Sequence, residues 1–289
     1  MNKGICFHFG YIYKNLNIKQ QTQDIKNAGF DCVMTTADPT FNNENRTIKK
    51  QVKVLKDNGI KLSSLHMRYK AVDLPYFWQD CKIGKKLENN IIKDIKVANK
   101  YGFTCVVIHL RGEFTEVGIN RLKNILTYCE KYNIPLALEN LNYNGKLLDK
   151  VFKTIKRDYL KFCYDVGHNH AFDPDVDYLT KYKNKVIALH LHDNLGKDVP
   201  IEKYKKIGYN KFSITDKTKY NPDMHTLNKY GNIDWEEVAL KLSKIKQPLN
   251  LDYEVLMCYR KNETAQEVLA EVYKQACKLE KTIEKYKNV

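Results

Sequence analysis

The most constraining feature of this sequence is a repeated unit, in which a short apolar or β-branched run precedes a stretch with helical periodicity. Eight strand-like runs occur, at Gly4–Phe9, Asp31–Thr35, Lys61–His66, Thr104–Leu110, Pro135–Asn140, Phe162–Val166, Val186–His192 and Leu249–Val255. Alternating strands and helices are typical of a parallel sheet, and eight such units can close into a barrel. The sequence therefore predicts an α/β protein, a (β/α)8 TIM barrel that residues 1–289 form as a single domain.

The stretches between the strands support this organisation. Helical periodicity is clearest at Arg46–Asn58, Lys85–Tyr101, Glu116–Tyr132, Trp235–Ile245 and Thr264–Lys285. Gly29, Gly59 and Gly102 each follow a helical run and precede a strand, as glycines that end helices do. The longest irregular stretch, Asn194–Asn232, follows the seventh strand. Loops of that length are usually functional, so we expect this one to cover the mouth of the barrel.

Charge and cysteine content narrow the class of protein. The net charge of +15 is compatible with a nucleic-acid partner, but only six of the 49 basic residues are arginine, the preferred reader of phosphates and bases. The eight cysteines form no CxxC pair, which favours buried, reduced thiols in a cytoplasmic protein. No apolar run reaches transmembrane length, and the first residues read as a strand instead of a signal peptide. We expect a cytoplasmic protein without a membrane partner.

The histidines give the strongest functional signal. Five lie at or near predicted strand ends: His8, His66, His109, His190 and His192. The other three, His168, His170 and His225, are expected in the loops that follow strands, and none in a helix. The active site of a (β/α)8 barrel is built from these strand ends and loops.

Carboxylates follow the same rule. Glu139, Asp165 and Glu254 each end a predicted strand, and Asp223 lies two residues before His225. Buried carboxylates are costly unless they are paired or bind a cation. Three of them beside imidazoles indicate a divalent metal, and mixed carboxylate and histidine ligands suit Mn, Zn, Fe or Co better than Ca.

Each candidate also has a structural interpretation. Glu139 and Glu254 could pair with Lys or Arg, and Asp165 could cap the turn before Gly167. His66 and His109 could be ordinary hydrogen-bonded barrel residues. Residues i and i+2 of a strand share a face, so His190 competes with His192, and we favour His190 as the ligand. We expect His8 and His170 not to be ligands. Tyr69, Trp78 and Trp235 are candidates for a sugar or base platform, although core packing suits Trp235 better.

The order of these candidate residues along the chain resembles that of a known family. Glu139, Asp165, His190 and Glu254 match the metal site of the xylose isomerase-like TIM barrel superfamily, and Asp223-x-His225 before Gly231-Asn232-Ile233-Asp234-Trp235 resembles it further. The superfamily includes sugar phosphate isomerases and epimerases and AP endonuclease family 2, the endonuclease IV type. The resemblance implies a divalent metal cofactor (Mn, Co, Zn, Fe or Mg) on those four residues.

The resemblance first implies a metal-dependent isomerase or epimerase acting on a sugar or sugar phosphate. Glu139 and Glu254 would transfer the proton, and His168 would orient a substrate oxygen. Tyr69 and Arg111 would contact the substrate, with Arg111 a candidate for a phosphate. The residues that could bind further metal or substrate are His66, His109, Asp223, His225 and His192. The sequence leaves the sugar, the metal and assembly into a homo-oligomer open.

The second hypothesis is an AP endonuclease that cleaves abasic DNA with several zinc ions. Its nine ligands all have matches in type: His66, His109, Glu139, Asp165, His168, His190, Asp223, His225 and Glu254. The neighbouring residues differ from that nuclease, because Val166-Gly167-His168 resembles the sugar enzymes and His192 stands where the nuclease has Asn. A third hypothesis is a barrel that binds sugar or metal without turnover.

Overall fold

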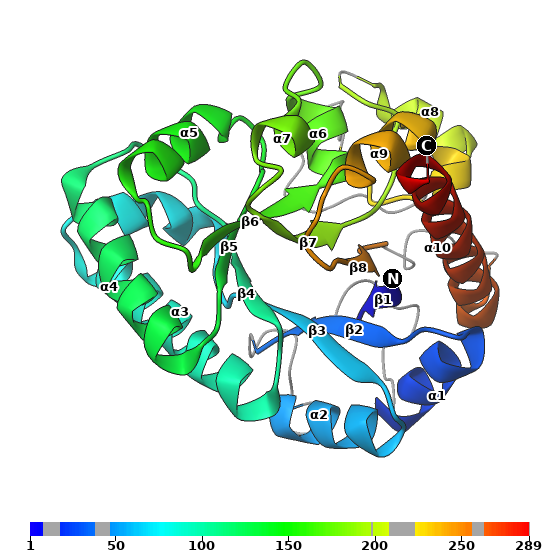
Figure 1. The fold of residues 1–289 in the computed structure, drawn as a ribbon, viewed down its shortest axis with the longest axis horizontal. Helices are drawn as coiled ribbons and strands as arrows, with labels where there is room; N and C mark the ends of the chain where they lie inside the picture. Colours follow the sequence, from blue (N-terminus) through cyan, green and yellow to red (C-terminus); the bar gives the residue numbers. More distant parts are fainter. Residues whose placement is uncertain (8–17, 38–46, 198, 208–222, 256–262, 289) are drawn as a thin grey trace.

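Eight parallel strands alternate with helices around a ring (Figure 1). The computed structural model describes residues 1–7, 18–37, 47–197, 199–207, 223–255 and 263–288. The strands are β1 (Asn2–Cys6), β2 (Cys32–Thr36), β3 (Lys61–His66), β4 (Cys105–Ile108), β5 (Leu136–Glu139), β6 (Leu160–Asp165), β7 (Val186–His190) and β8 (Asn250–Tyr253). All eight predicted strands are therefore present, with ends that differ by a few residues.

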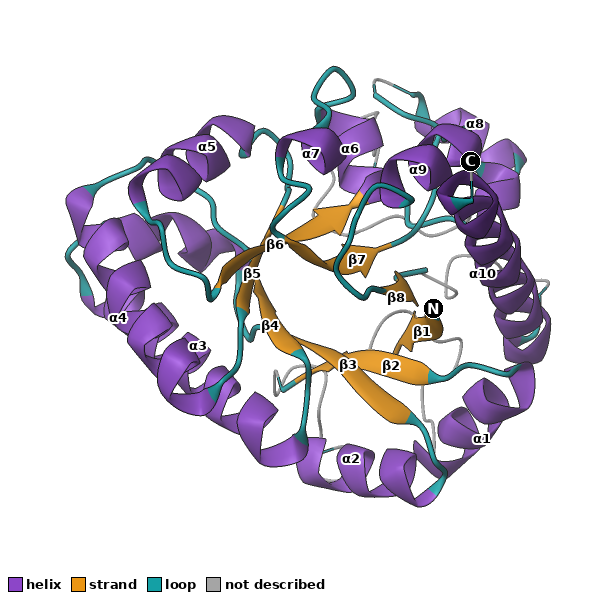
Figure 2. Ribbon diagram, viewed as in Figure 1, coloured by secondary structure: helices purple, strands orange, loops and turns teal. Residues whose placement is uncertain are grey.

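Helices form an outer layer around the strands (Figure 2). They are α1 (Ile18–Ala28), α2 (Ile48–Asp57), α3 (Lys82–Tyr101), α4 (Glu116–Tyr132), α5 (Gly145–Thr154), α6 (Val166–Phe172), α7 (Tyr178–Lys181), α8 (Ile201–Lys206), α9 (Trp235–Leu242) and α10 (Ala265–Lys287). Two 3-10 helices, η1 (Ala71–Trp78) and η2 (Asn228–Tyr230), lie in connections. The predicted glycine helix ends are confirmed, since Gly29, Gly59 and Gly102 have φ of 99°, 76° and 85°.

The strand order is β7-β6-β5-β4-β3-β2-β1-β8, and every pair is parallel. A bridge between Leu191 and Tyr253 joins the two outer strands just past the end of β7. There the Leu191 amide donates to the Asp252 carbonyl at 2.9 Å, and the Glu254 amide donates to the Leu191 carbonyl at 2.9 Å. The sheet thus forms a nearly closed barrel, and the predicted fold class is confirmed.

Side-chain alternation along the strands determines what lines the barrel. Small residues gather inside it: Cys105, Val107, Ala137, Cys163 and Ala188 form a buried cluster separate from the larger one that packs against the helices. Residues two positions further along a strand share the same face. Ala137, Cys163 and Ala188 are therefore followed on the inner face by Glu139, Asp165 and His190, the last residues of β5, β6 and β7.

Two local predictions need correction. His168 and His170 were expected in a loop, but both lie in the short helix α6. Asp165 starts this helix, because its side chain accepts a hydrogen bond from the His168 amide at 2.6 Å. Helix α8 lies within the predicted loop Asn194–Asn232, of which residues 198 and 208–222 are outside the described part of the chain.

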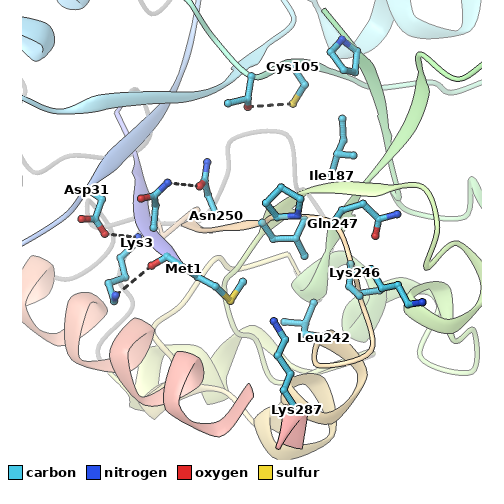
Figure 3. A pocket seen from close by; sticks show the side chains of 16 residues that line it. Met1, Lys3, Asp31, Cys105, Ile187, Leu242, Lys246, Gln247, Asn250 and Lys287 are labelled. Atoms are coloured by element: carbon cyan, nitrogen blue, oxygen red, sulfur yellow. Dashed lines mark hydrogen bonds between the residues drawn. The ribbon is translucent and has the colours of Figure 1, made fainter. Parts of the chain in front are cut away.

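A cavity of about 810 Å³ lies at the amino-terminal end of the strands (Figure 3). Met1, Asn250 and Cys105 line it, and the Lys3 amide donates to Asp31 Oδ2 at 2.8 Å along its edge. None of the candidate metal or catalytic residues lines this cavity. (β/α)8 enzymes carry their active sites at the carboxyl ends of the strands, which is the other end of this barrel.

The described helices and cysteines bear on two composition-based expectations. Among the described helices, none combines the length and the apolar character that a bilayer-spanning segment needs. The seven described cysteines are all free thiols, and five of them are buried. The eighth, Cys258, lies outside the described residues.

Candidate metal centre

Four side chains from neighbouring strands meet at the carboxyl end of the barrel. Glu139, Asp165 and His190 end β5, β6 and β7, and Glu254 directly follows β8. The Nδ1 atom of His190 lies 3.2 Å from Glu139 Oε2, 3.9 Å from Asp165 Oδ2 and 2.9 Å from Glu254 Oε2. All four residues are buried. The four positions predicted as the metal site thus form one cluster.

A second group extends this cluster through Glu139. The Nε2 atoms of His66 and His109 lie 3.0 Å apart, and Glu139 Oε2 lies 3.0 Å from His109 Nε2. The third side, between His66 Nε2 and Glu139 Oε2, is 3.7 Å. Two donors that each lie about 2.1 Å from a tetrahedral zinc ion are about 3.4 Å apart. The triangle therefore has the dimensions of a metal-binding face.

A third group, His168, His192, Asp223 and His225, lies on the other side of Asp165. Asp223 joins two of its imidazoles, with His225 Nε2 2.9 Å from Oδ1 and His168 Nε2 3.4 Å from Oδ2. The Nε2 atom of His192 lies 3.0 Å from Asp165 Oδ1. His190 and His192 thus belong to different groups. Of these two histidines, His190 is the one that belongs to the first cluster.

Backbone carbonyls orient three of these histidines. The Nδ1 atoms of His66, His168 and His225 lie 3.1, 3.0 and 2.7 Å from the carbonyls of Met67, Asn140 and Glu254. A carbonyl only accepts, so each Nδ1 carries the proton and donates it. Metal-ligating histidines are commonly fixed in this way, with the other nitrogen directed at the ion.

The donors fit a divalent ion on further grounds. Both ring nitrogens of His190 are buried, and Nδ1 lies 2.9 and 3.2 Å from the oxygens of Glu254 and Glu139 without the alignment of a hydrogen bond. Leaving buried polar atoms unsatisfied is costly, and a cation on Nδ1 would remove part of that cost. Mixed imidazole and carboxylate donors suit Zn, Mn, Fe or Co. The residues present therefore fit the cofactor that the sequence implies.

Neighbouring carboxylates and imidazoles shift each other's pKa values in this region. Burial alone would raise the pKa of Glu139, but His190 and His109 hold that pKa well below its ordinary value. Glu254 behaves in the same way, since burial opposes its ionisation and His190 lowers its pKa strongly. Burial would lower the pKa of His225, but Asp223 raises it to about 9. Both glutamates are therefore ionised at neutral pH, which is the state in which a carboxylate binds a metal ion.

A cavity of about 150 Å³ adjoins the second and third groups. It combines apolar walls with charged and hydrogen-bonding groups, as ligand sites do. The lining residues are Tyr69, Ala71, Leu74, His109, Arg111, Leu141, Asn142, His168, Phe172 and Asp223. Both predicted substrate contacts, Tyr69 and Arg111, are among them. The ring of Tyr69 packs edge-on against that of His109 with 4.7 Å between centroids.

Of the remaining sequence candidates, those that the structure describes take no part in the donor groups. His8 is outside the described residues. His170 points to Asn232, with its Nε2 2.8 Å from the amide oxygen, and is in none of the donor groups. Trp78 is buried in the core, which is incompatible with a sugar platform. The Nε1 atom of Trp235 donates to Asp193 at 2.6 Å, so this tryptophan serves packing and loop attachment.

Some contributing residues were not singled out from the sequence. Cys163 lies close to Glu139 and His190, and the signal for it was its position two residues before Asp165 on the same face. Asp193 bonds to the segment that carries His225, and burial raises the pKa of this aspartate to about 6. Asn144 donates to the Glu139 carbonyl at 3.0 Å and to the Leu110 carbonyl at 3.2 Å, and the second of these is a tertiary contact for which the sequence has no local signal.

The fold and the site together define the class of protein. The chain belongs to the xylose isomerase-like TIM barrel family, whose model matches residues 22–275. No curated protein sequence matches the chain.

Three solved structures illustrate the similarity in fold. A D-tagatose 3-epimerase-like protein is 19% identical with a TM-score of 0.70, and the match covers 100% of this chain and 99% of that one. D-psicose 3-epimerase from Clostridium cellulolyticum H10, solved with D-tagatose, is 15% identical with a TM-score of 0.63, covering 99% and 96%. The IolI protein, solved with a zinc atom, is 18% identical with a TM-score of 0.64, covering 99% of both chains.

Proposed function

We propose that the protein is a divalent-metal-dependent isomerase or epimerase that moves a proton next to the carbonyl group of an open-chain sugar. The observation that carries this proposal is the meeting of Glu139, Glu254 and Asp165 around His190 Nδ1, within 3.2, 2.9 and 3.9 Å. This arrangement offers two ionised glutamates beside one metal position. The similarity in fold to D-psicose 3-epimerase and to a D-tagatose 3-epimerase-like protein supports the same reaction class.

Metal binding, proton transfer and substrate orientation would each fall to particular residues of the site. Glu139, Asp165, His190 and Glu254 would hold the ion, which when bound would polarise the substrate carbonyl as a Lewis acid. One glutamate oxygen would take the proton from the carbon next to the carbonyl, and the C–H electron pair would move toward the carbonyl oxygen. The other glutamate would take a proton from a neighbouring substrate hydroxyl and deliver it to the carbon skeleton, and the first glutamate would give its proton back to that oxygen, so that both carboxylates end ionised. His168, fixed by the Asn140 carbonyl at 3.0 Å, would orient a substrate hydroxyl.

Proton exchange tests this proposal without knowledge of the natural sugar. Metal-loaded protein would be incubated in D₂O with a panel of ketoses, aldoses and their phosphates, and deuterium uptake next to the carbonyl would be followed by NMR. The expected result is uptake in at least one sugar, lowered at least about 100-fold by Glu254→Gln. Glu280→Gln is the matched control, because Glu280 pairs with Lys3 at the other end of the barrel. No uptake with any sugar, at full metal content, would contradict the proposal.

A second candidate function rests on a separate observation. Glu139 Oε2 lies 3.0 Å from His109 Nε2 and 3.2 Å from His190 Nδ1, so this carboxylate can bridge two ions. Adjacent ions that share a carboxylate are typical of phosphodiester hydrolysis. This alternative, an endonuclease IV-like AP endonuclease, predicts about three zinc ions per chain and cleavage of an abasic duplex. Its DNA binding would also weaken steeply as salt rises.

A further inference from the structure

We propose that the substrate carries an anionic group, a phosphate or a carboxylate, and that Arg111 binds this group in the wall of the cavity beside the metal centre. The inference rests on the proposed function, because it names the substrate class for the same site.

Four of the arginines lie in the described part of the chain, and three of them form ion pairs with carboxylates. The pairs are Arg68 with Asp94, Arg121 with Glu88, and Arg157 with Glu130. Arg111 is the exception, since it forms no ion pair with any described carboxylate. Its Nη2 group donates instead to the amide oxygen of Asn142. An amide fixes the direction of a guanidinium but leaves its charge unbalanced.

Arg111 lies where its positive charge can contact a bound ligand. Arg111 and Asn142 both line the cavity of about 150 Å³, and Arg111 follows the candidate metal donor His109 by two residues. Arg111 is partly buried, and a partly buried cation without a counter-charge is costly. Its remaining N–H groups form the planar fork that matches carboxylate and phosphate oxygens.

The opposite charge lies elsewhere on the cavity wall. Asp223 lines the cavity, and Glu139 lies just beyond His109, with 3.0 Å between the nearest atoms. These carboxylates would repel an anion and favour hydroxyl or carbonyl groups once an ion is bound. The carboxylate side of the cavity therefore suits the reacting end of a sugar, and the Arg111 side suits an anionic end. Its small volume fits a short carbon chain better than a large ligand.

Calorimetric titration of metal-loaded protein with three four-carbon probes tests the inference. The probes are D-erythrose 4-phosphate, D-erythronate and erythritol, which differ in carrying a phosphate, a carboxylate or no charge. At least one anionic probe should bind about tenfold or more tightly than erythritol, and the preferred anion identifies the group. Arg111→Gln should weaken that binding about ten- to a hundredfold and leave erythritol unchanged.

Two further variants make the test specific. Asn142→Asp places a carboxylate next to the guanidinium and should weaken anion binding to a similar extent, while keeping Arg111. Arg157→Gln removes an arginine whose pairing with Glu130 lies at the surface, and it should bind all three probes as the native chain does. Unfolding temperature and metal content of each variant would be measured first, so that weakened binding is not a folding defect.

The failure of this inference can be told apart from failure of the proposed function. Equal binding of anionic probes by the native chain and by Arg111→Gln, or erythritol binding as tight as both anions, would overturn the inference, whatever the deuterium exchange shows. Binding of abasic duplex DNA with no response to any small probe would also overturn it, because Arg111 would then serve a DNA phosphate. Absence of deuterium exchange together with Arg111-dependent anion binding would overturn the isomerase alone.

Discussion

The imidazole ring of His192 lies flat against the ring of His225, with 3.7 Å between centroids and 11° between planes. The Nε2 atom of His192 also lies 3.0 Å from Asp165 Oδ1. One side chain therefore contacts a candidate metal donor in each of two groups. This is the position of an outer partner, which orients a ligating carboxylate and packs beside a ligating imidazole.

His192 should accordingly tune metal affinity without holding an ion. We expect His192→Ala to retain the native metal count but to weaken affinity about 10- to 100-fold, because Asp165 loses its partner. His192→Gln keeps an N–H group at that position and should weaken affinity less. Plasma mass spectrometry gives the count, and competition with a chelating dye gives the affinity. Loss of a whole metal equivalent in both variants would make His192 a ligand.

Gly167 should be indispensable to the position of His192. A Cβ atom at residue 167 would overlap the His192 ring. We expect Gly167→Ala to lower the free energy of unfolding by about 1–3 kcal/mol, measured by urea denaturation. The same substitution in a His192→Ala background should cost much less, because the ring is gone. An equal cost in both backgrounds would show that the overlap is not the cause.

Asp193 should control the segment that carries Asp223 and His225. Its carboxylate accepts from Trp235 Nε1 at 2.6 Å and from the Ile233 amide at 3.1 Å. Asp193→Asn replaces one acceptor oxygen with a donor. We expect the free energy of unfolding to fall by about 1–3 kcal/mol, and metal affinity to fall at the third group while the β5–β8 donors keep their ion.

Trp235→Phe provides the comparison for that prediction. It removes one of the donors to Asp193 and keeps an aromatic ring, so its effect on metal affinity should be smaller. Metal titrations of the three proteins, each followed by calorimetry, would measure the difference. An unchanged titration curve for Asp193→Asn would separate this aspartate from the metal centre.

The barrel and its four-residue cluster could be predicted from the sequence because both follow from simple periodicities. Parallel strands covered on both faces read as continuous apolar runs, and the eight runs were long enough to recognise. A charged residue at the end of such a run lies at the carboxyl edge of the sheet. This rule alone predicts that Glu139 and Asp165 lie at adjacent strand ends, with no knowledge of tertiary contacts.

Other parts of the site depend on contacts that periodicity does not encode. The sharing of a face by residues i and i+2 does not by itself separate His190 from His192, because that rule holds only within a strand and β7 ends at His190. Helix α6 has seven residues, too few for a recognisable periodic pattern, and its start depends on Asp165. The pairing of Arg111 with Asn142 joins two loops and has no local signature.

The pH dependence of stability should reveal proton and metal competing for the same donors. Asp223, 2.9 Å away, raises the pKa of His225 to about 9, above the ordinary value of 6.5. In metal-stripped protein, protonated His225 should therefore stabilise the fold fully below about pH 6.5, and this contribution should be lost as pH rises through about 9. An ion on the same donors displaces the proton, so its stabilising effect should grow over that window.

Unfolding temperatures of stripped and zinc-loaded protein, measured from about pH 6 to about pH 10, would check this expectation. The difference between the two curves should widen as the pH rises. His225→Gln removes the titrating group, so its stripped form should lose less stability over the same range. A constant difference between stripped and loaded protein, unaltered in His225→Gln, would mean that His225 does not lie at a metal position.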